Sequence, residues 1–288
     1  MVRQLEIEAP AKINLTLNVL GKRADGYHEL ETVMQQISLR DRIFLQVGGH
    51  GIKIESNSSL IPNNEENLAY KAAHLLYSKF SIEEGLQIFI EKNIPVGAGL
   101  AGGSTDAAGV MLGVNELFGL NLTREDLLSL GLTIGSDVPF CLLGGAAVAR
   151  GRGEILTPLP EGPQLNMVLV KPDFQLSTAE VYRDFRLDRV KNSPDNAAFL
   201  EAWLKYDIIE LAEQMKNVLE TVSVEKCPEI EHIKEKLNVL GALKTLMSGS
   251  GPSVVGVFSS RDKAIKAWEI IKDQYREAYQ VSSYNRGD

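Results

Sequence analysis

Residues 95–105 read PVGAGLAGGST, and this stretch decides the fold and the chemistry of the chain. A strand-like run, Leu86–Ile90, precedes it, and a helix-like run, Asp106–Phe118, follows it. A glycine-rich turn that opens a helix leaves unpaired backbone N–H groups at the positive end of the helix dipole. Because glycine has no Cβ, the backbone there can approach an anion closely. The stretch therefore predicts a phosphate-binding loop, to which Ser104 and Thr105 add hydroxyl groups for phosphate or a metal.

Two common phosphate loops differ from this one in spacing. The P-loop carries a lysine directly before its final hydroxyl residue, whereas Gly103 stands before Ser104 here. The dinucleotide fingerprint is met by Gly97, Gly99 and Gly102, but residues 117–123 lack the acidic residue expected further along the chain. A nicotinamide enzyme is therefore a minor alternative. The cations that neutralise the phosphates must come from elsewhere in the sequence.

The composition is that of a globular protein. The 288 residues are 44% hydrophobic and 24% charged, which suits two domains. A net charge of -8 without a long basic run argues against a nonspecific nucleic-acid binder. The sequence shows no membrane-length apolar stretch, no signal-peptide pattern and no CxxC pair, since Cys141 and Cys227 are far apart. We expect a cytoplasmic protein that binds neither nucleic acid nor membranes.

Strand and helix patterns are mixed in both halves, which predicts an α+β fold. The proline-rich residues 157–164 are the best candidate for a domain boundary. The expected strands are Glu6–Leu20 with a break near Pro10, Ile37–Val47, Gly51–Glu55, Phe140–Ala149, Glu154–Leu156, Leu165–Val170, Leu243–Met247, Ser253–Phe258 and an edge strand at the end. The expected helices are Asn67–Phe80, Thr123–Leu132 with an N-cap at Thr123, Ser177–Phe185, several between 196 and 240, and Asp262–Gln274.

Three segments, in order along the chain, resemble the motifs of the GHMP kinases, the superfamily of galactokinase, homoserine kinase and mevalonate kinase. They are PAKINL from Pro10, the loop at 95–105, and LMSGSGPSVVGVF at Leu246–Phe258. DGYHEL at Asp25–Leu30 and GSDVPF at Gly135–Phe140 look most like those members that phosphorylate 4-diphosphocytidyl-2-C-methyl-D-erythritol. The resemblance spans nearly the whole chain.

This resemblance implies a two-domain fold with a cleft between the domains. Residues 1–158 would form a ribosomal-protein-like βαβ domain, and residues 159–288 a ferredoxin-like domain. ATP with Mg²⁺ would donate a phosphoryl group to a hydroxyl of the cytidine-diphosphate-linked polyol, a step of the non-mevalonate isoprenoid precursor pathway. The expected protein is a monomer or weak homodimer. Another GHMP kinase of homoserine or mevalonate type, and a non-enzymatic nucleotide sensor, are the alternatives.

The resemblance also implies a catalytic pair. Asp137 in GSDVPF matches the aspartate of the family, and Lys12 in PAKINL matches its lysine. A carboxylate within hydrogen-bond reach of the acceptor hydroxyl can take its proton. The lysine can keep that carboxylate ionised and stabilise the developing negative charge.

The chain also offers candidate contacts for the substrate and for adenine. His28 would hydrogen-bond cytosine, Tyr27 and Tyr182 would supply aromatic faces for it, and Asn14 and Thr178 would reach the same acceptor. Asn67 would contact adenine.

The ATP-binding loop should include Pro95, Val96, Gly97, Ala98, Gly99, Leu100, Ala101, Gly102, Gly103, Ser104 and Thr105. Which of the two hydroxyls would touch Mg²⁺ stays open. Family loops often have glycine where Ala98 and Ala101 stand, so these two residues should keep ordinary negative φ angles. The resemblance also implies that the second glycine turn, SGSGPS at Ser248–Ser253, lines the cleft and braces the phosphate loop.

Overall fold

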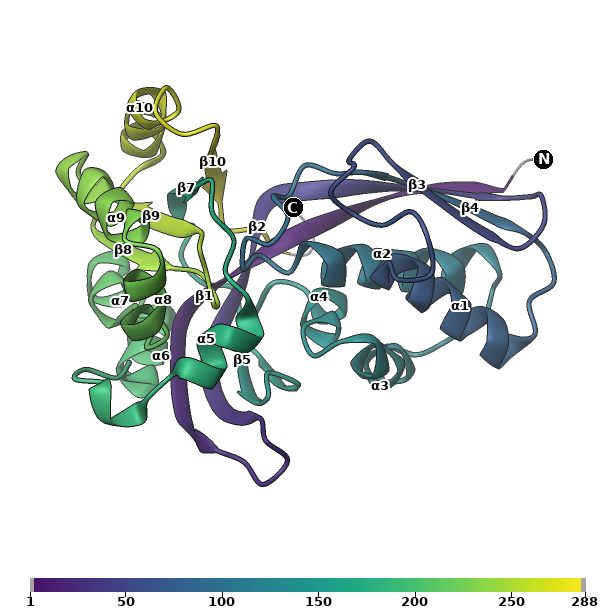
Figure 1. Cartoon of the computed structure of the whole chain (residues 1–288), viewed down its shortest axis with the longest axis horizontal. Coiled ribbons are helices and arrows are strands. Elements are labelled where there is room, and N and C mark those ends of the chain that lie inside the picture. The colour runs from purple at the N-terminus through teal and green to yellow at the C-terminus, as the bar shows by residue number, and fades with distance from the viewer. Residues whose placement is uncertain (1–2, 286–288) are drawn as a thin grey trace. The chain divides into compact units, whose positions relative to one another are not determined.

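The structure, a computed structural model, describes residues 3–285, and its chain divides into two compact units (Figure 1). The long strands β1 (Gln4–Lys22) and β2 (His28–Val47) contribute residues to both units. The first unit consists of the segments up to Ala11, Leu39–Val96 and Ala101–Gly144, and the second of Lys12–Ser38, Gly97–Leu100 and the chain from Gly145 onward. The predicted domain boundary after residue 158 stays a prediction.

In the first unit a sheet is covered by helices on one face. Strand β4 (Leu86–Glu91) pairs antiparallel with the Arg42–Val47 part of β2 and parallel with β3 (Ile52–Ser56). Helix α2 packs close to this sheet, because a Cβ on Gly113 would lie only 2.2 Å from the Leu45 side chain. The helices of the unit are α1 (Leu68–Phe80), α2 (Gly102–Leu117), α3 (Arg124–Ile134) and α4 (Val138–Leu143).

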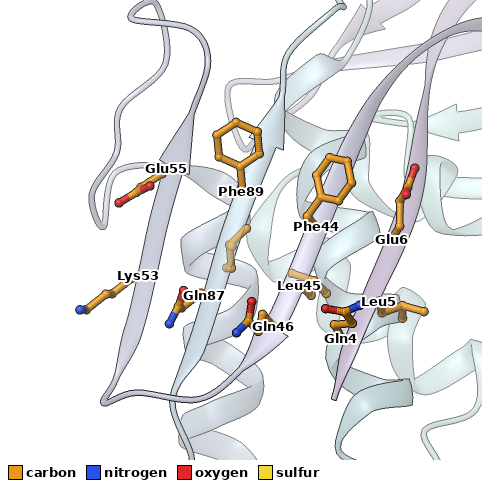
Figure 2. A pocket seen from close by; sticks show the side chains of 11 residues that line it. Gln4, Leu5, Glu6, Phe44, Leu45, Gln46, Lys53, Glu55, Gln87 and Phe89 are labelled. Atoms are coloured by element: carbon orange, nitrogen blue, oxygen red, sulfur yellow. The ribbon is translucent and has the colours of Figure 1, made fainter. Parts of the chain in front are cut away.

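The other face of the same sheet carries a concavity of about 600 Å³ (Figure 2). Successive side chains of a strand point to opposite faces, so Phe44 and Phe89 line this concavity while Ile43 is buried on the side of helix α2. The Phe44 and Phe89 rings pair with centroids 6.2 Å apart. None of the predicted site residues lines it.

The second unit contains two sets of paired strands. Residues Leu30–Gln35 of β2 pair antiparallel with β5 (Ala146–Gly151), and β5 pairs with β6 (Ile155–Pro158). A separate antiparallel sheet has the order β10–β7–β9–β8, with α9 and α10 packed against it. Its strands are β7 (Asn166–Lys171), β8 (Lys244–Met247), β9 (Val254–Phe258) and β10 (Glu277–Ser282). The helices are α5 (Thr178–Asp184), a short 3₁₀ turn (Leu187–Arg189), α6 (Asn196–Leu204), α7 (Ile208–Gln214), α8 (Glu220–Lys226), α9 (Glu229–Val239) and α10 (Arg261–Ile271).

Most predicted elements are confirmed with ends shifted by a few residues, although β2 begins at His28, well before the predicted start at Ile37. Two predictions are wrong. Strand β1 continues through Pro10 without the expected break. Among the described strands, β1 joins the sheet only through β2, and such an edge position tolerates the missing N–H of proline. The predicted strand at Phe140–Ala149 begins instead as helix α4, where Pro139 in the first turn favours a helix start and Gly144, with φ of 78°, ends it.

The C-terminal segment is an edge strand, β10, as expected. Within residues 3–285, the helices are all too short or too polar to cross a bilayer.

Candidate active site

The phosphate loop takes a left-handed backbone at three positions. Gly97 and Gly99 have φ of 67° and 75°, and Ala101 has φ of 57°. Ala98 keeps an ordinary φ as expected, whereas the prediction for Ala101 is wrong. This alanine is the N-cap of α2, and its carbonyl accepts the N–H of Thr105 at 2.9 Å. The start of the helix thus holds Ala101 in a conformation that costs about 1–2 kcal/mol for a residue with a Cβ.

The second unit braces the loop through uncharged groups. Ser248 Oγ donates a hydrogen bond to the Gly99 carbonyl at 3.1 Å, and a Cβ on Gly99 would lie 2.5 Å from the Ser248 carbonyl oxygen. The Lys12 N–H donates to the Leu100 carbonyl at 3.1 Å. The prediction that the SGSGPS turn braces the loop is therefore confirmed.

Sequence reasoning missed the residue that holds this turn. Asn217 Nδ2 donates to the carbonyls of Met247 and Gly249, both at 2.7 Å, and its Oδ1 accepts the N–H of Leu219. No motif surrounds Asn217 in the sequence, so no local signal could have found it.

Lys12 is buried in the second unit, with 5% of its surface exposed. Its Nζ donates to Asn14 Oδ1 at 2.9 Å, and Asn14 Nδ2 donates to Thr32 Oγ1 at 2.8 Å. The two residues share one face of β1, as their spacing predicted. Asn14 therefore orients the Lys12 ammonium, and its substrate contact stays a prediction.

Asp137 belongs to the first unit, where it is the N-cap of α4 and its carbonyl accepts the N–H of Cys141 at 3.1 Å. Lys12 belongs to the second unit. Their action as a pair stays a prediction.

His28 is half-buried at the start of β2 among aromatic rings. The Tyr182 ring lies 5.4 Å from the His28 ring, and the Phe185 ring meets it edge-on at 6.2 Å. Burial lowers the pKa of His28, and the positive charge of Lys22 lowers it further. A neutral imidazole offers one donor and one acceptor, which is the pattern that a cytosine edge can match. Phe185 was missed, although it follows Tyr182 at the spacing of one helical turn.

Tyr27 lies apart from this cluster. It is 56% exposed, and the Arg152 guanidinium stacks on its ring at 4.9 Å from the centroid. Its contact with cytosine stays a prediction.

The remaining predicted residues have local partners. Thr178 Oγ1 lies 2.7 Å from Ser250 Oγ. Asn67 is the N-cap of α1: its Oδ1 accepts the N–H of Ala69, and its Nδ2 donates to the Pro62 carbonyl. Thr105 is buried and Ser104 is partly exposed, so Ser104 is the more accessible hydroxyl. The substrate contact of Thr178 and the ATP or Mg²⁺ contacts of Asn67, Ser104 and Thr105 stay predictions.

Comparison with known proteins decides the family. The models for the GHMP kinases N terminal domain and the GHMP kinases C terminal domain match residues 67–145 and 199–277. A 4-diphosphocytidyl-2-C-methyl-D-erythritol kinase of Syntrophomonas wolfei is 59% identical over 284 residues, covering 99% of this chain and 100% of its own. The chain belongs to the GHMP kinase family.

Other relatives agree with this assignment. The enzyme of the same name from Geobacillus thermodenitrificans is 50% identical, with 93% of each chain covered. A crystal structure of 4-(cytidine 5'-diphospho)-2C-methyl-D-erythritol kinase superimposes with a TM-score of 0.86 at 36% identity, covering 98% of this kinase and 100% of that chain. A homoserine kinase from Cytophaga hutchinsonii shares the fold. It superimposes with a TM-score of 0.78 at 20% identity, covering 98% of this kinase and 95% of that chain. The predicted two-domain α+β fold and phosphotransferase activity from ATP to an alcohol are confirmed.

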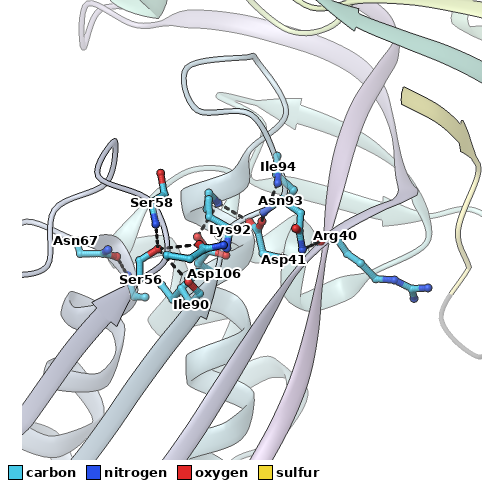
Figure 3. A network of polar contacts seen from close by, with 12 residues as sticks. Arg40, Asp41, Ser56, Ser58, Asn67, Ile90, Lys92, Asn93, Ile94 and Asp106 are labelled. Carbon is cyan, nitrogen blue, oxygen red and sulfur yellow. Dashed lines mark hydrogen bonds and ion pairs between the residues drawn. The ribbon is translucent and has the colours of Figure 1, made fainter. Parts of the chain in front are cut away.

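This kinase also contains a buried ionic cluster that sequence reasoning missed (Figure 3). Lys92 Nζ donates to the carboxylates of Asp41 and Asp106, at 2.8 Å for Asp106, and all three side chains are at most 5% exposed. Lys92 stands three residues before the loop, so its nearness to the glycines was the available signal. Its partner Asp106 directly follows the loop, whereas Asp41 is 51 residues away from Lys92, a separation at which no local pattern reveals a pair.

Proposed function

We propose that this GHMP kinase transfers the γ-phosphoryl group of ATP to a hydroxyl of 4-diphosphocytidyl-2-C-methyl-D-erythritol, a step toward isoprenoid precursors in the non-mevalonate pathway. The acceptor is the one named for relatives up to 59% identical. The observation that carries the proposal is the placement of the His28 ring, whose pKa is lowered by burial, beside Tyr182 and Phe185. It provides aromatic surface and edge hydrogen bonding for a cytosine base, which homoserine and mevalonate lack.

The phosphate loop would hold the triphosphate through backbone N–H groups at the start of α2. This helix has 16 residues, and its dipole favours negative charge at that end. Phosphoryl transfer depends on alignment and on stabilising charge more than on covalent participation by the protein. The fixed left-handed positions at Gly97, Gly99 and Ala101 support this role, because a rigid loop needs little reorganisation when ATP binds.

Asp137 would accept the proton of the attacking hydroxyl, and Lys12 would stabilise the negative charge that develops on its oxygen. Asn14 supports this role, because its Oδ1 directs the Lys12 ammonium. Residues 3–285 contain no group of three or more acidic, histidine or cysteine side chains that could hold a metal by themselves. This fits Mg²⁺ carried mainly by the phosphates, where it would neutralise part of their charge, with Ser104 as the proposed protein contact.

We further propose a cytoplasmic monomer or weak homodimer that binds neither nucleic acid nor membranes. The net charge of -8 and the two cysteines without a disulfide support this. Analytical ultracentrifugation with and without double-stranded DNA would test the assembly and the absence of nucleic-acid binding.

The test of function is an ATP-consumption assay with three alcohols in parallel: the cytidine-linked methylerythritol, homoserine and mevalonate. We expect turnover with the first alone. Asp137→Ala should abolish turnover while a nonhydrolysable ATP analogue still binds. Turnover with homoserine or mevalonate would assign another GHMP activity, and binding of ATP without any phosphorylated product would favour a nucleotide sensor.

A further inference from the structure

The ionic cluster of Asp41, Lys92 and Asp106 connects both ends of the phosphate loop (Figure 3). On the entering side, Asp41 Oδ1 accepts the backbone N–H groups of Asn93 and Ile94, at 2.6 and 2.8 Å. These two residues directly precede the loop at 95–105. The second carboxylate oxygen of Asp41 accepts from Lys92. One aspartate of β2 thus fixes the path by which the chain enters the loop.

On the leaving side, the same ammonium reaches helix α2. Lys92 Nζ donates to Asp106 Oδ2 at 2.8 Å, and Asp106 directly follows the loop. A Cβ on Gly102 would lie 2.9 Å from Lys92 Nζ, so the lysine passes directly against the first turn of the helix. The first turn is where the backbone N–H groups proposed to hold phosphate begin.

We propose that Asp41, Lys92 and Asp106 are positioning residues for ATP, which set the spacing between the two ends of the phosphate loop. This inference rests on the proposed function, because it gives the loop the task of holding the triphosphate. The Lys92 ammonium is 5% exposed and is shared by two carboxylates, so it acts through the loop.

The carboxylates of Asp41 and Asp106 differ in how many hydrogen bonds they accept. Asp41 accepts three hydrogen bonds, from Lys92 Nζ and from the backbone N–H groups of Asn93 and Ile94. Asp106 Oδ1 is buried and finds no hydrogen-bond partner among residues 3–285. The charged groups that face Asp106 are Lys92 from the end of β4 and Asp41 from β2. The contact that matters at Asp106 is therefore the single bond from Lys92 to Oδ2, and an asparagine can accept that bond through its amide oxygen.

The test separates the KM for ATP from the KM for the alcohol. In Asp106→Ala we expect the KM for ATP to rise about tenfold, because a small displacement of the loop misaligns all its N–H groups. The KM for the cytidine-linked alcohol should not change. Asp106→Asn should restore a KM for ATP close to that of the native chain. Asp126→Ala is the matched control: it removes the capping box of α3 in the same unit and should leave both KM values unchanged.

A purely structural role would lower the active fraction and hence kcat, with both KM values unchanged, and that result would overturn the inference. Equal defects in Asp106→Ala and Asp106→Asn would overturn it as well. If the alanine variant does not fold, Asp41→Asn should show the same rise in the KM for ATP. Calorimetry measures the affinity of each variant for a nonhydrolysable ATP analogue without any alcohol present. The role of the cluster in ATP binding is thereby tested independently of the identity of the acceptor. Weaker binding in Asp106→Ala than in Asp106→Asn supports the inference even if the proposed acceptor is wrong.

Discussion

The phosphate loop is braced in two chemically different ways. In the second unit, Ser248 and the glycine turn hold Gly99 through a hydroxyl, backbone carbonyls and close approach. In the first unit, Asp41, Lys92 and Asp106 hold the loop ends through buried charges. We call these the neutral brace and the charged brace. The close approach in the neutral brace is possible because Gly99 has no Cβ. The charged brace depends instead on the balance between one ammonium and two carboxylates.

This difference determines how each brace should fail. A neutral hydrogen bond contributes about 1 kcal/mol net, so its loss should be mild unless a clash is added. A buried charge that loses its partner costs about 3–5 kcal/mol, because the remaining charge stays desolvated. The charged brace should also respond to pH, and the neutral brace should not.

Removing the cation should have the largest effect. Lys92→Met leaves the Asp41 and Asp106 carboxylates buried without a counter-charge, and we expect it to lower the free energy of unfolding by about 3–5 kcal/mol. Urea denaturation followed by circular dichroism measures this value. The control is Lys71→Met at an exposed position of α1, which should change stability by less than about 0.5 kcal/mol. Equal losses in both variants would show that the cluster is not a charged brace.

A clash in the neutral brace should come next. Gly99→Ala places a Cβ 2.5 Å from the Ser248 carbonyl oxygen at a φ of 75°, and we expect a loss of about 2 kcal/mol or more together with a higher KM for ATP. Gly119→Ala is the matched control, because Gly119 has a φ of 58° but no atom within 4 Å of its added Cβ. Gly119→Ala should lose stability through backbone strain only, and its KM for ATP should equal that of the native chain. A normal KM in Gly99→Ala would mean that the turn does not set the loop position.

Loss of one neutral hydrogen bond should be smaller. Ser248→Ala removes the donor to the Gly99 carbonyl, and we expect about 1 kcal/mol of destabilisation by thermal denaturation. Ser253→Ala in the same turn is the comparison. Its hydroxyl is buried and lacks a partner within the described part of the chain, so its removal should be neutral or stabilising. If Ser253→Ala costs as much as Ser248→Ala, the bond to Gly99 is not what stabilises the turn.

The last prediction, a dependence of stability on pH, concerns the charged brace alone. Burial raises the pKa of Asp106 to about 7 from 3.8, with the Asp41 charge adding to the shift and Lys92 opposing it. A raised pKa stabilises the folded chain fully below 3.8, and this contribution is lost as the pH rises through about 7. The melting temperature of the native chain, relative to Asp106→Asn, should therefore fall between pH 5 and pH 8.

The control for this prediction is Asp126→Asn. Hydrogen bonds from Thr123 lower the pKa of Asp126, so it stays ionised across that range and its difference from the native chain should be constant. A constant difference for Asp106→Asn too would mean that Asp106 does not titrate there.

The two glycine turns of the neutral brace were visible in the sequence, whereas their contact across 149 residues was implied by the resemblance to the GHMP kinases. Glycine turns and the hydroxyls beside them have short-range signatures, and the cap of α3 at Thr123 was predicted for the same reason. The left-handed backbone of Ala101 was not predicted, because this conformation is unfavourable for an alanine by itself and is imposed by the start of α2. The strand predicted at Phe140–Ala149 was wrong in its first part, because a short buried apolar run has no periodicity to separate helix from strand, whereas Ala146–Ala149 do belong to β5.

The charged brace could not be predicted. Lys92 and Asp41 are 51 residues apart, and only the pairing of β2 with β4 brings them together. In a sequence with 68 acidic and basic side chains, a pair at that separation has no signature. Resemblance to the GHMP kinases supplied Lys12 and Asp137, which no pattern of periodicity would have singled out.

The central claim is that the loop at 95–105 holds the triphosphate of ATP through its backbone N–H groups. A crystal structure with a nonhydrolysable ATP analogue tests it most directly. We expect phosphate oxygens within hydrogen-bond distance of these N–H groups, with Lys92 still joined to Asp41 and Asp106. A triphosphate bound elsewhere, away from residues 95–105, would contradict it.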